Sequence, residues 1–261
     1  MELGDIMKIG IFDSGIGGLS VLHYAMNLYP HASYIYYADK DHVPYGEKTR
    51  EQVLEYVKDI FDFLIDKKCD AIVIACNTAT SVATKELRST YPIPIIGMEP
   101  AVKKAVELYG HTQKKILVAA TPITVTGDKL SQLIASLNYP YIETIALPLL
   151  VRFAEKSEFD SAEVLNYLND IFKDYKFDDY EAIVLGCTHF NYFKDVLKKI
   201  FGKHIHFVDG NQGTITHLFH KIEYKETEFD LEVYYSKRKI NEDEMKDIVK
   251  YFYRLDSMYK I

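Results

Sequence analysis

The chain has 261 residues, of which 48% are hydrophobic and 26% charged, and its formal net charge is −7. This length allows one large unit or two modest lobes with a substantial core. No apolar run approaches the roughly 18 residues of a membrane helix, and no basic stripe would match a nucleic acid backbone. Met1 to Asp5 lack the basic and then apolar layout of a signal peptide, so we expect a cytoplasmic protein with neither membrane nor nucleic acid as its primary partner.

Cysteine and histidine patterns exclude two further classes of protein. Cys69, Cys76 and Cys187 are odd in number and form no CxxC pair, which argues against a disulfide framework and a structural zinc site. The nine histidines show no metal-ligand spacing. We therefore expect three free thiols and no metal ion.

Strands and helices alternate along the first hundred residues. In chain order, the patterns predict a strand over 8–12, a helix over 19–28, a strand over 33–38, a helix over 49–67, a strand over 71–75, a helix ending near 89 and a strand over 93–96. The run 71–75 is apolar throughout, as is typical of a strand buried on both faces of a parallel sheet. The proline in 93–96 favours an edge strand or a crossing between lobes.

A second series follows Glu99 and Pro100. It predicts a helix over 101–109, a strand over 115–120, a helix over 127–137, a strand over 141–146, a helix over 161–175, a strand over 181–186, a helix over 192–201 and a strand over 206–209. This alternation predicts an α/β fold of mostly parallel sheets flanked by helices, with right-handed crossovers. We expect the residues after 213 to pack back on the first lobe.

Two segments look like copies of each other: 70–78 reads DAIVIACNT and 181–189 reads EAIVLGCTH. Each places a cysteine where a strand ends, at the edge where open α/β sheets bind ligands. This echo predicts two pseudo-symmetric lobes with the active site in the cleft between them. One lobe would comprise residues 1–98 with 210–261, and the other residues 99–209.

A cysteine at a strand-to-helix junction lies where free N–H groups and the helix dipole favour a thiolate. The plain alternative is a small buried hydrophobe, which we expect for Cys69 at the start of its strand. Cys76 and Cys187 differ because hydrogen-bonding residues follow them. These are Asn77, Thr78, Thr188 and His189, and the histidine is either a surface residue or a proton-handling partner of the thiol.

The glycine-rich loop 15–18 after the first strand invites a dinucleotide-binding interpretation, with Asp39 near the place of a ribose-binding acid. Ser20 stands where that motif needs its third glycine, and no phosphate-binding GxxxxGK[ST] occurs. We therefore assign the loop's function to Asp13 and Ser14, with helix capping as the alternative.

Two more loops carry candidate site residues at the carboxyl ends of strands. Pro44, Tyr45 and Gly46 are compatible either with a site or with ordinary loop packing. Thr121 opens a run of hydroxyls that suits a carboxylate, or that only caps a helix.

Four segments together are similar to the signature motifs of glutamate racemases, in the aspartate/glutamate racemase superfamily. They are 9–18 (IGIFDSGIGG), 43–46 (VPYG), 75–79 (ACNTA) and 186–190 (GCTHF). The resemblance covers about residues 7–210. It implies a cofactor-independent enzyme that interconverts L- and D-glutamate, with D-glutamate destined for bacterial peptidoglycan.

The resemblance also implies roles for residues. Cys76 would deprotonate the D isomer with Asp13 assisting, and Cys187 the L isomer with His189 assisting. Glu155 would correspond to a family acid near the second cysteine. The implied substrate-binding residues are Asp13, Ser14, Pro44, Tyr45, Gly46, Asn77, Thr78, Thr121, Thr188 and His189.

Thiols suit this chemistry. Racemisation removes the α-proton from one face and returns a proton to the other, so one group on each side of the substrate suffices. A thiol pKa of about 8.5 keeps both protonation states accessible. The weakly acidic α-proton requires donors on the substrate carboxylate in a dry cleft.

Other functions stay open at this stage. An aspartate racemase would use the same thiols, although an acid is more typical of that group where this chain has His189. A non-catalytic amino-acid binder, or a protein acting through an interaction such as gyrase inhibition, would not need both cysteines with polar partners. A thiol redox protein is disfavoured because no CxxC occurs. The sequence does not determine the oligomeric state, and both a monomer and a homodimer are compatible with it.

Overall fold

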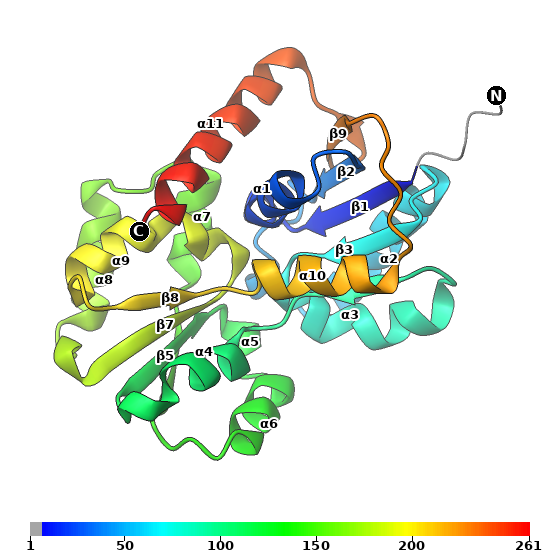
Figure 1. The fold of residues 1–261 in the computed structure, drawn as a ribbon. Helices are drawn as coiled ribbons and strands as arrows, with labels where there is room; N and C mark the ends of the chain where they lie inside the picture. Colours follow the sequence, from blue (N-terminus) through cyan, green and yellow to red (C-terminus); the bar gives the residue numbers. More distant parts are fainter. Residues whose placement is uncertain (1–6) are drawn as a thin grey trace.

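The computed structural model describes residues 7–261, so the pattern at Met1 to Asp5 lies outside the described residues. Two parallel-stranded sheets, each flanked by helices, form two lobes (Figure 1). This confirms the predicted α/β fold of two lobes. No helix within residues 7–261 is both long enough and apolar enough to span a membrane.

We call the part around the larger sheet the first lobe. It contains β1 (Lys8–Asp13), α1 (Leu19–Leu28), β2 (Ser33–Ala38), the 3-10 helix η1 (Tyr45–Glu47), α2 (Arg50–Asp66), β3 (Ala71–Ile74), α3 (Asn77–Thr90) and β4 (Ile95–Gly97). The end of the chain adds α10 (Asn211–Lys221), β9 (Asp230–Tyr235), β10 (Arg238–Lys239) and α11 (Glu242–Tyr259).

The second lobe lies between these two parts of the chain. It contains α4 (Val102–Tyr109), η2 (Gly110–Thr112), β5 (Lys115–Ala120), α5 (Pro122–Val125), α6 (Asp128–Ser136), β6 (Ile142–Ala146), α7 (Pro148–Glu155), α8 (Ala162–Phe172), η3 (Phe177–Asp179), β7 (Tyr180–Gly186), η4 (Thr188–Phe193), α9 (Lys194–Phe201) and β8 (His206–Val208).

The two sheets repeat one strand order. The first is β10-β9-β2-β1-β3-β4 and the second is β6-β5-β7-β8, so β2-β1-β3-β4 corresponds to β6-β5-β7-β8. Apart from the antiparallel β9–β10 pair, neighbouring strands are parallel. β3 and β7 therefore hold equivalent places. The segments that follow them carry Cys76 and Cys187, which sets one cysteine at the same edge of each sheet.

Of the elements that differ from the sequence patterns, two bear on the site. α7 was not predicted, although Pro148 at its first turn is a helix-start signal and Leu150, Val151 and Ala154 form its buried face. The helix predicted over 192–201 is an α-helix only from Lys194, because the preceding residues form the 3-10 helix η4. Both differences matter for the site.

The tyrosine-rich C-terminal segment binds to both lobes. β9 pairs with β2 and extends the first sheet. α11 begins with a capping box between Asn241 and Glu244 and then runs across to the second lobe (Figure 1). There Arg254 donates hydrogen bonds to the carbonyl of Tyr192 in η4 and pairs with Asp195 at 2.7 Å. The last helix thus holds the loop that follows Cys187.

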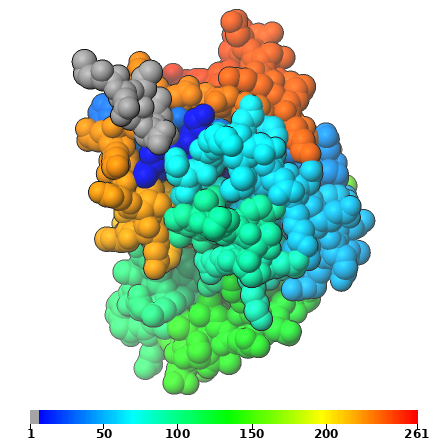
Figure 2. Space-filling view, turned by 90° about the vertical axis from the view of Figure 1, so that its right-hand side faces the viewer, coloured from blue at the N-terminus to red at the C-terminus, as the bar shows by residue number. Residues whose placement is uncertain are grey.

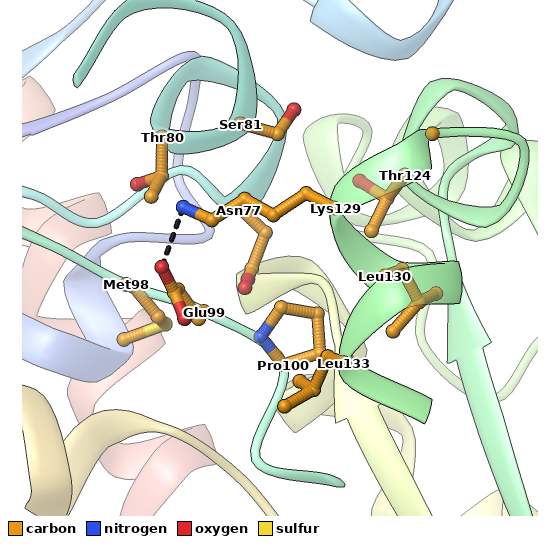
Figure 3. A pocket seen from close by; sticks show the side chains of 11 residues that line it. Asn77, Thr80, Ser81, Met98, Glu99, Pro100, Thr124, Lys129, Leu130 and Leu133 are labelled. Atoms are coloured by element: carbon orange, nitrogen blue, oxygen red, sulfur yellow. Dashed lines mark ion pairs between the residues drawn. The ribbon is translucent and has the colours of Figure 1, made fainter. Parts of the chain in front are cut away.

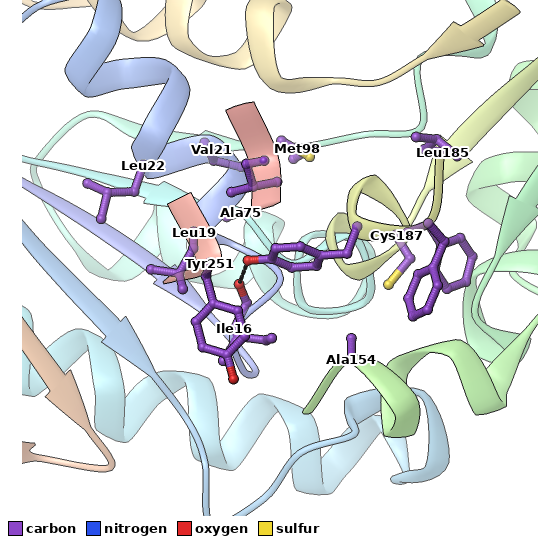
Figure 4. Close-up of a cluster of buried hydrophobic side chains, with 14 of the residues drawn as sticks. Ile16, Leu19, Val21, Leu22, Ala75, Met98, Ala154, Leu185, Cys187 and Tyr251 are labelled. Carbon is purple, nitrogen blue, oxygen red and sulfur yellow. Dashed lines mark hydrogen bonds between the residues drawn. The ribbon is translucent and has the colours of Figure 1, made fainter. Parts of the chain in front are cut away.

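One hydrophobic cluster continues through both lobes (Figure 4). Ile16 and Leu19 come from the first lobe, Leu185 from the second and Tyr251 from α11. The Tyr192 hydroxyl donates to the Ile16 carbonyl at 3.0 Å within this cluster. Figure 2 shows the first lobe, blue to teal, seated directly on the green second lobe. The lobes are therefore packed in a closed arrangement.

Candidate active site

A small cavity of about 10 Å³ lies between the lobes and is lined by residues from both. The lining residues are Ser14, Pro44, Tyr45, Gly46, Cys76, Asn77, Thr78, Thr121, Val151, Cys187, Thr188 and His189. All the predicted site residues except Asp13 and Glu155 line this cavity. Val151 also lines it, although the sequence did not predict it as a site residue. The volume is about that of one water molecule, so a larger ligand does not fit in this arrangement of the lobes.

Cys76 caps the N-terminus of α3. Its Sγ accepts a hydrogen bond from the Ala79 N–H at 3.4 Å and donates to the Ser14 hydroxyl at 3.8 Å. Burial raises the pKa of this thiol, and the nearby charge of Asp13 raises it further. The closed protein therefore favours the thiol form at Cys76.

Asp13 is fully buried at the end of β1 and joins the two lobes. Its carboxylate accepts the Gly15 N–H at 3.0 Å and, from the second lobe, the Thr188 hydroxyl at 3.0 Å. Burial raises the pKa of Asp13, while the charge of His189 and these hydrogen bonds oppose the rise. The carboxylate thus lies between the polar neighbours of both cysteines.

Cys187 has a different electrostatic setting from Cys76. We expected a helix N-terminus here, but the α-helix starts only at Lys194, and the Cys187 side chain makes no capping hydrogen bond. Its polar partner is His189, whose Nδ1 lies 3.7 Å from Sγ. Cys187 therefore has an imidazole beside it, whereas Cys76 lies at the N-terminus of an α-helix.

His189 is held by Glu155, and the contact is 2.7 Å between Nε2 and Oε1. The same carboxylate accepts the Ile16 N–H at 2.7 Å and Lys40 Nζ at 2.5 Å. Burial opposes the imidazolium, but hydrogen bonds and charges of Cys187 and Glu155 raise the pKa of His189 to about 10. Burial likewise opposes the carboxylate, yet His189 and Lys40 hold the pKa of Glu155 at about 2. Both residues are therefore charged at neutral pH.

This buried pair predicts a pH-dependent stability. The contribution of His189 is complete below its ordinary pKa of 6.5 and is lost as the pH rises through about 10. The contribution of Glu155 is complete above its ordinary pKa of 4.5 and is lost as the pH falls through about 2. Glu155→Gln should therefore lower the free energy of unfolding by about 3 kcal/mol at pH 6, and by less at pH 10.

Denaturant titration of both proteins at pH 6, 8 and 10 measures this effect. Glu107→Gln serves as the control, because Glu107 meets Lys103 at 3.8 Å on the surface, where a pair contributes under about 1 kcal/mol. A destabilisation by Glu155→Gln that stays constant across these pH values would contradict the assignment.

The glycine-rich loop packs against the second lobe. A Cβ added to Gly17 would overlap the Thr188 and His189 side chains and lie 2.7 Å from the His189 backbone nitrogen. A Cβ on Gly15 would overlap Glu155. The loop has no space for the phosphate of a dinucleotide, and its glycines allow close approach of two chain segments. Asp39 accepts a hydrogen bond from the Tyr45 hydroxyl at 2.5 Å, so it holds in place a residue that lines the cavity.

Hydroxyl and amide groups line the remaining wall. Thr78 and Thr121 contact each other across the lobes at 2.9 Å. Asn77 is 5% exposed, yet neither polar atom of its amide has a partner within residues 7–261. Figure 3 shows Asn77 beside a second cavity of about 30 Å³, over which Lys129 pairs with Glu99. An unpartnered buried amide is suited to a ligand.

Lys40 and Val151 are site residues that the sequence analysis missed. Val151 lies in the helix that was not predicted. Lys40 follows Asp39 in a loop and belongs to no motif, so no sequence signal distinguishes it from other surface lysines.

Three comparisons with known proteins agree. The family model described as Asp/Glu/Hydantoin racemase matches residues 20–218. A glutamate racemase of Lachnospira eligens is 52% identical over 98% of this chain and 100% of its own length. The crystal structure of glutamate racemase from Campylobacter jejuni matches with a TM-score of 0.79 at 27% identity, over 94% of this chain and 97% of that chain.

A third relative was crystallised with ligands. Escherichia coli glutamate racemase, in complex with L-glutamate and the activator UDP-MurNAc-ala, matches with a TM-score of 0.77 at 29% identity, over 85% of this chain and 84% of that chain. The chain therefore belongs to the Asp/Glu/Hydantoin racemase family and, within it, to the glutamate racemases, which are amino-acid isomerases.

Proposed function

We propose that this protein interconverts L- and D-glutamate without a cofactor, with Cys76 and Cys187 as two bases on opposite sides of the substrate. The observation that carries the proposal is that each lobe contributes one cysteine to the same small cavity between the lobes. A cytoplasmic enzyme of this kind would supply D-glutamate for peptidoglycan.

In the L-to-D direction, the Cys187 thiolate takes the α-proton, so a C–H bond breaks and an S–H bond forms. The Cys76 thiol then gives its proton to the opposite face of the carbanion and becomes a thiolate. The reverse direction exchanges these roles. The raised pKa of Cys76 supports the thiol as the resting acid, and the contact of His189 with Cys187 supports the base.

Substrate binding would rely on local donors, because the net charge of −7 repels a substrate with two carboxylates. Ser14, Asn77, Thr78, Thr121 and Thr188 provide hydroxyl and amide donors around the cavity. The ligand of the E. coli relative supports glutamate as the substrate. We further propose that the lobes, residues 1–98 with 210–261 and residues 99–209, part as units to admit it.

The test uses purified protein in D₂O without added cofactor, supplied separately with L-glutamate, D-glutamate and both aspartate enantiomers. Chiral chromatography with mass spectrometry should show conversion of glutamate only, and the α-deuterium should appear first in the newly formed enantiomer. Equal early labelling of the starting enantiomer would indicate a single base. Conversion of aspartate alone would identify an aspartate racemase instead.

A further inference from the structure

Glu155 receives three hydrogen bonds, and two of the donors come from the opposite lobe. Oε1 accepts the Ile16 N–H and contacts His189 Nε2. Oε2 contacts Lys40 Nζ at 2.5 Å, and residues 7–261 offer it no other hydrogen-bond donor. Lys40 follows β2 of the first lobe, whereas Glu155 ends α7 of the second. The contact therefore joins the two lobes in this arrangement.

We propose that Lys40 is a positioning residue that completes the Cys187–His189–Glu155 chain from the opposite lobe. The chain of contacts is continuous from Lys40 Nζ through the carboxylate and the imidazole to Cys187 Sγ. Closure of the lobes would thus bring the last charge into place beside the second cysteine. This inference rests on the proposed two-cysteine racemisation.

The burial of the partner separates this ion pair from ordinary surface pairs. The Glu155 side chain is 13% exposed, whereas Asp59, paired with Lys237, is 60% exposed. A buried carboxylate that loses a partner stays poorly solvated, so its orientation depends on the donors that remain. Loss of Lys40 would leave Oε2 free and loosen the group that orients His189.

Other charged or titratable groups face the chain from several elements. Asp13 of β1, Tyr36 of β2 and Tyr192 of η4 lie near Glu155. Near Lys40 are Glu244 and the ring of Tyr235, whose centroid lies 5.4 Å from Nζ. Arg238 of β10 pairs with Glu244 at 2.6 Å, whereas His189 and Lys40 are the cations that lower the pKa of Glu155. Removal of Lys40 therefore makes each neighbouring proton harder to release.

Lys40→Met and Lys40→Arg test the inference. The methionine variant keeps the length of the side chain without its charge, and we expect kcat/KM to fall roughly 10- to 100-fold, mainly through kcat. Because the equilibrium constant between enantiomers is one, the fall must be equal in both directions. The acidic limb of the pH profile of kcat/KM should move to higher pH. Lys40→Arg should keep most of the wild-type activity and the wild-type position of the acidic limb.

Lys58→Met is the matched control, because Lys58 pairs with Glu86 on the surface of the same lobe. This variant should leave kcat, KM and the pH profile unchanged. Suppose that the wild type is active but Lys40→Met either leaves the acidic limb of the pH profile unshifted or changes only KM. This result would overturn the role of Lys40 and leave the proposed function standing. A wild type that does not racemise glutamate would overturn both. Thermal unfolding of each variant checks that it is folded.

Discussion

Replacing either Cys76 or Cys187 by alanine is expected to abolish racemisation of glutamate in both directions, by at least roughly 10³-fold. Each thiol is the base in one direction and the acid in the other, so neither direction survives the loss of one. Cys76→Ser and Cys187→Ser keep the approximate size of the side chain, and Cys76→Ser places an oxygen where the sulfur caps α3. They should be equally inactive, because a hydroxyl does not ionise near neutral pH.

Cys69→Ala is the matched control for these variants. Cys69 is also buried, but it lies in the first-lobe core, where burial raises its pKa to about 12. Its loss should leave the turnover rate unchanged. Circular dichroism of pure enantiomers measures all five variants, and full activity with either catalytic cysteine replaced would refute the two-base mechanism.

Gly17→Ala should also lower the activity strongly, although residue 17 carries no chemistry. The added methyl group would overlap Thr188 and His189 and press on the backbone of His189, which cannot turn aside as a side chain can. Either the loop after Cys187 shifts or the lobes stay apart. A displacement of about 1 Å at a reacting group can cost roughly 100-fold in rate. We expect such a loss, with a destabilisation of about 1–3 kcal/mol.

Gly213→Ala provides the contrasting case. An added Cβ at Gly213 meets nothing within 4 Å, and the residue lies inside α10. Alanine is the better helix former, so this variant should be more stable by about 0.5–1 kcal/mol and fully active. Steady-state kinetics and thermal melts compare the two variants. Wild-type kinetics in Gly17→Ala would show that the close approach of the lobes is not needed.

The sequence predicted those parts of the fold that local patterns encode. The strands over 33–38 and 115–120 agree with β2 and β5 residue for residue, because apolar runs between turn signals define both ends. The internal echo around the cysteines indicated two lobes, and the repeated strand order confirms them. The sequence patterns did not predict α7, because this helix is only eight residues long and follows its strand without a polar loop.

The candidate site was predictable as a set of residues but not as a set of contacts. Motifs at strand ends identified Asp13 and His189, and their assigned roles stay predictions. The sequence could not show that Thr188 donates to Asp13 or that Lys40 reaches Glu155. These contacts depend on how the two sheets face each other, which hydrophobic periodicity does not encode. The same limit explains why the glycine-rich loop looked like a phosphate site.

The two crossings of the chain between the lobes lie side by side, and this restricts how the enzyme can open. A Cβ on Gly210, in the returning segment, would lie 3.0 Å from Met98 and 3.1 Å from the Glu99 carbonyl in the outgoing one. If the lobes part as we propose, these two adjacent covalent links would act as one hinge line, about which the lobes could rotate but along which they could not slide. Such a hinge would keep each cysteine at a high effective concentration relative to the other through every exchange of substrate for product.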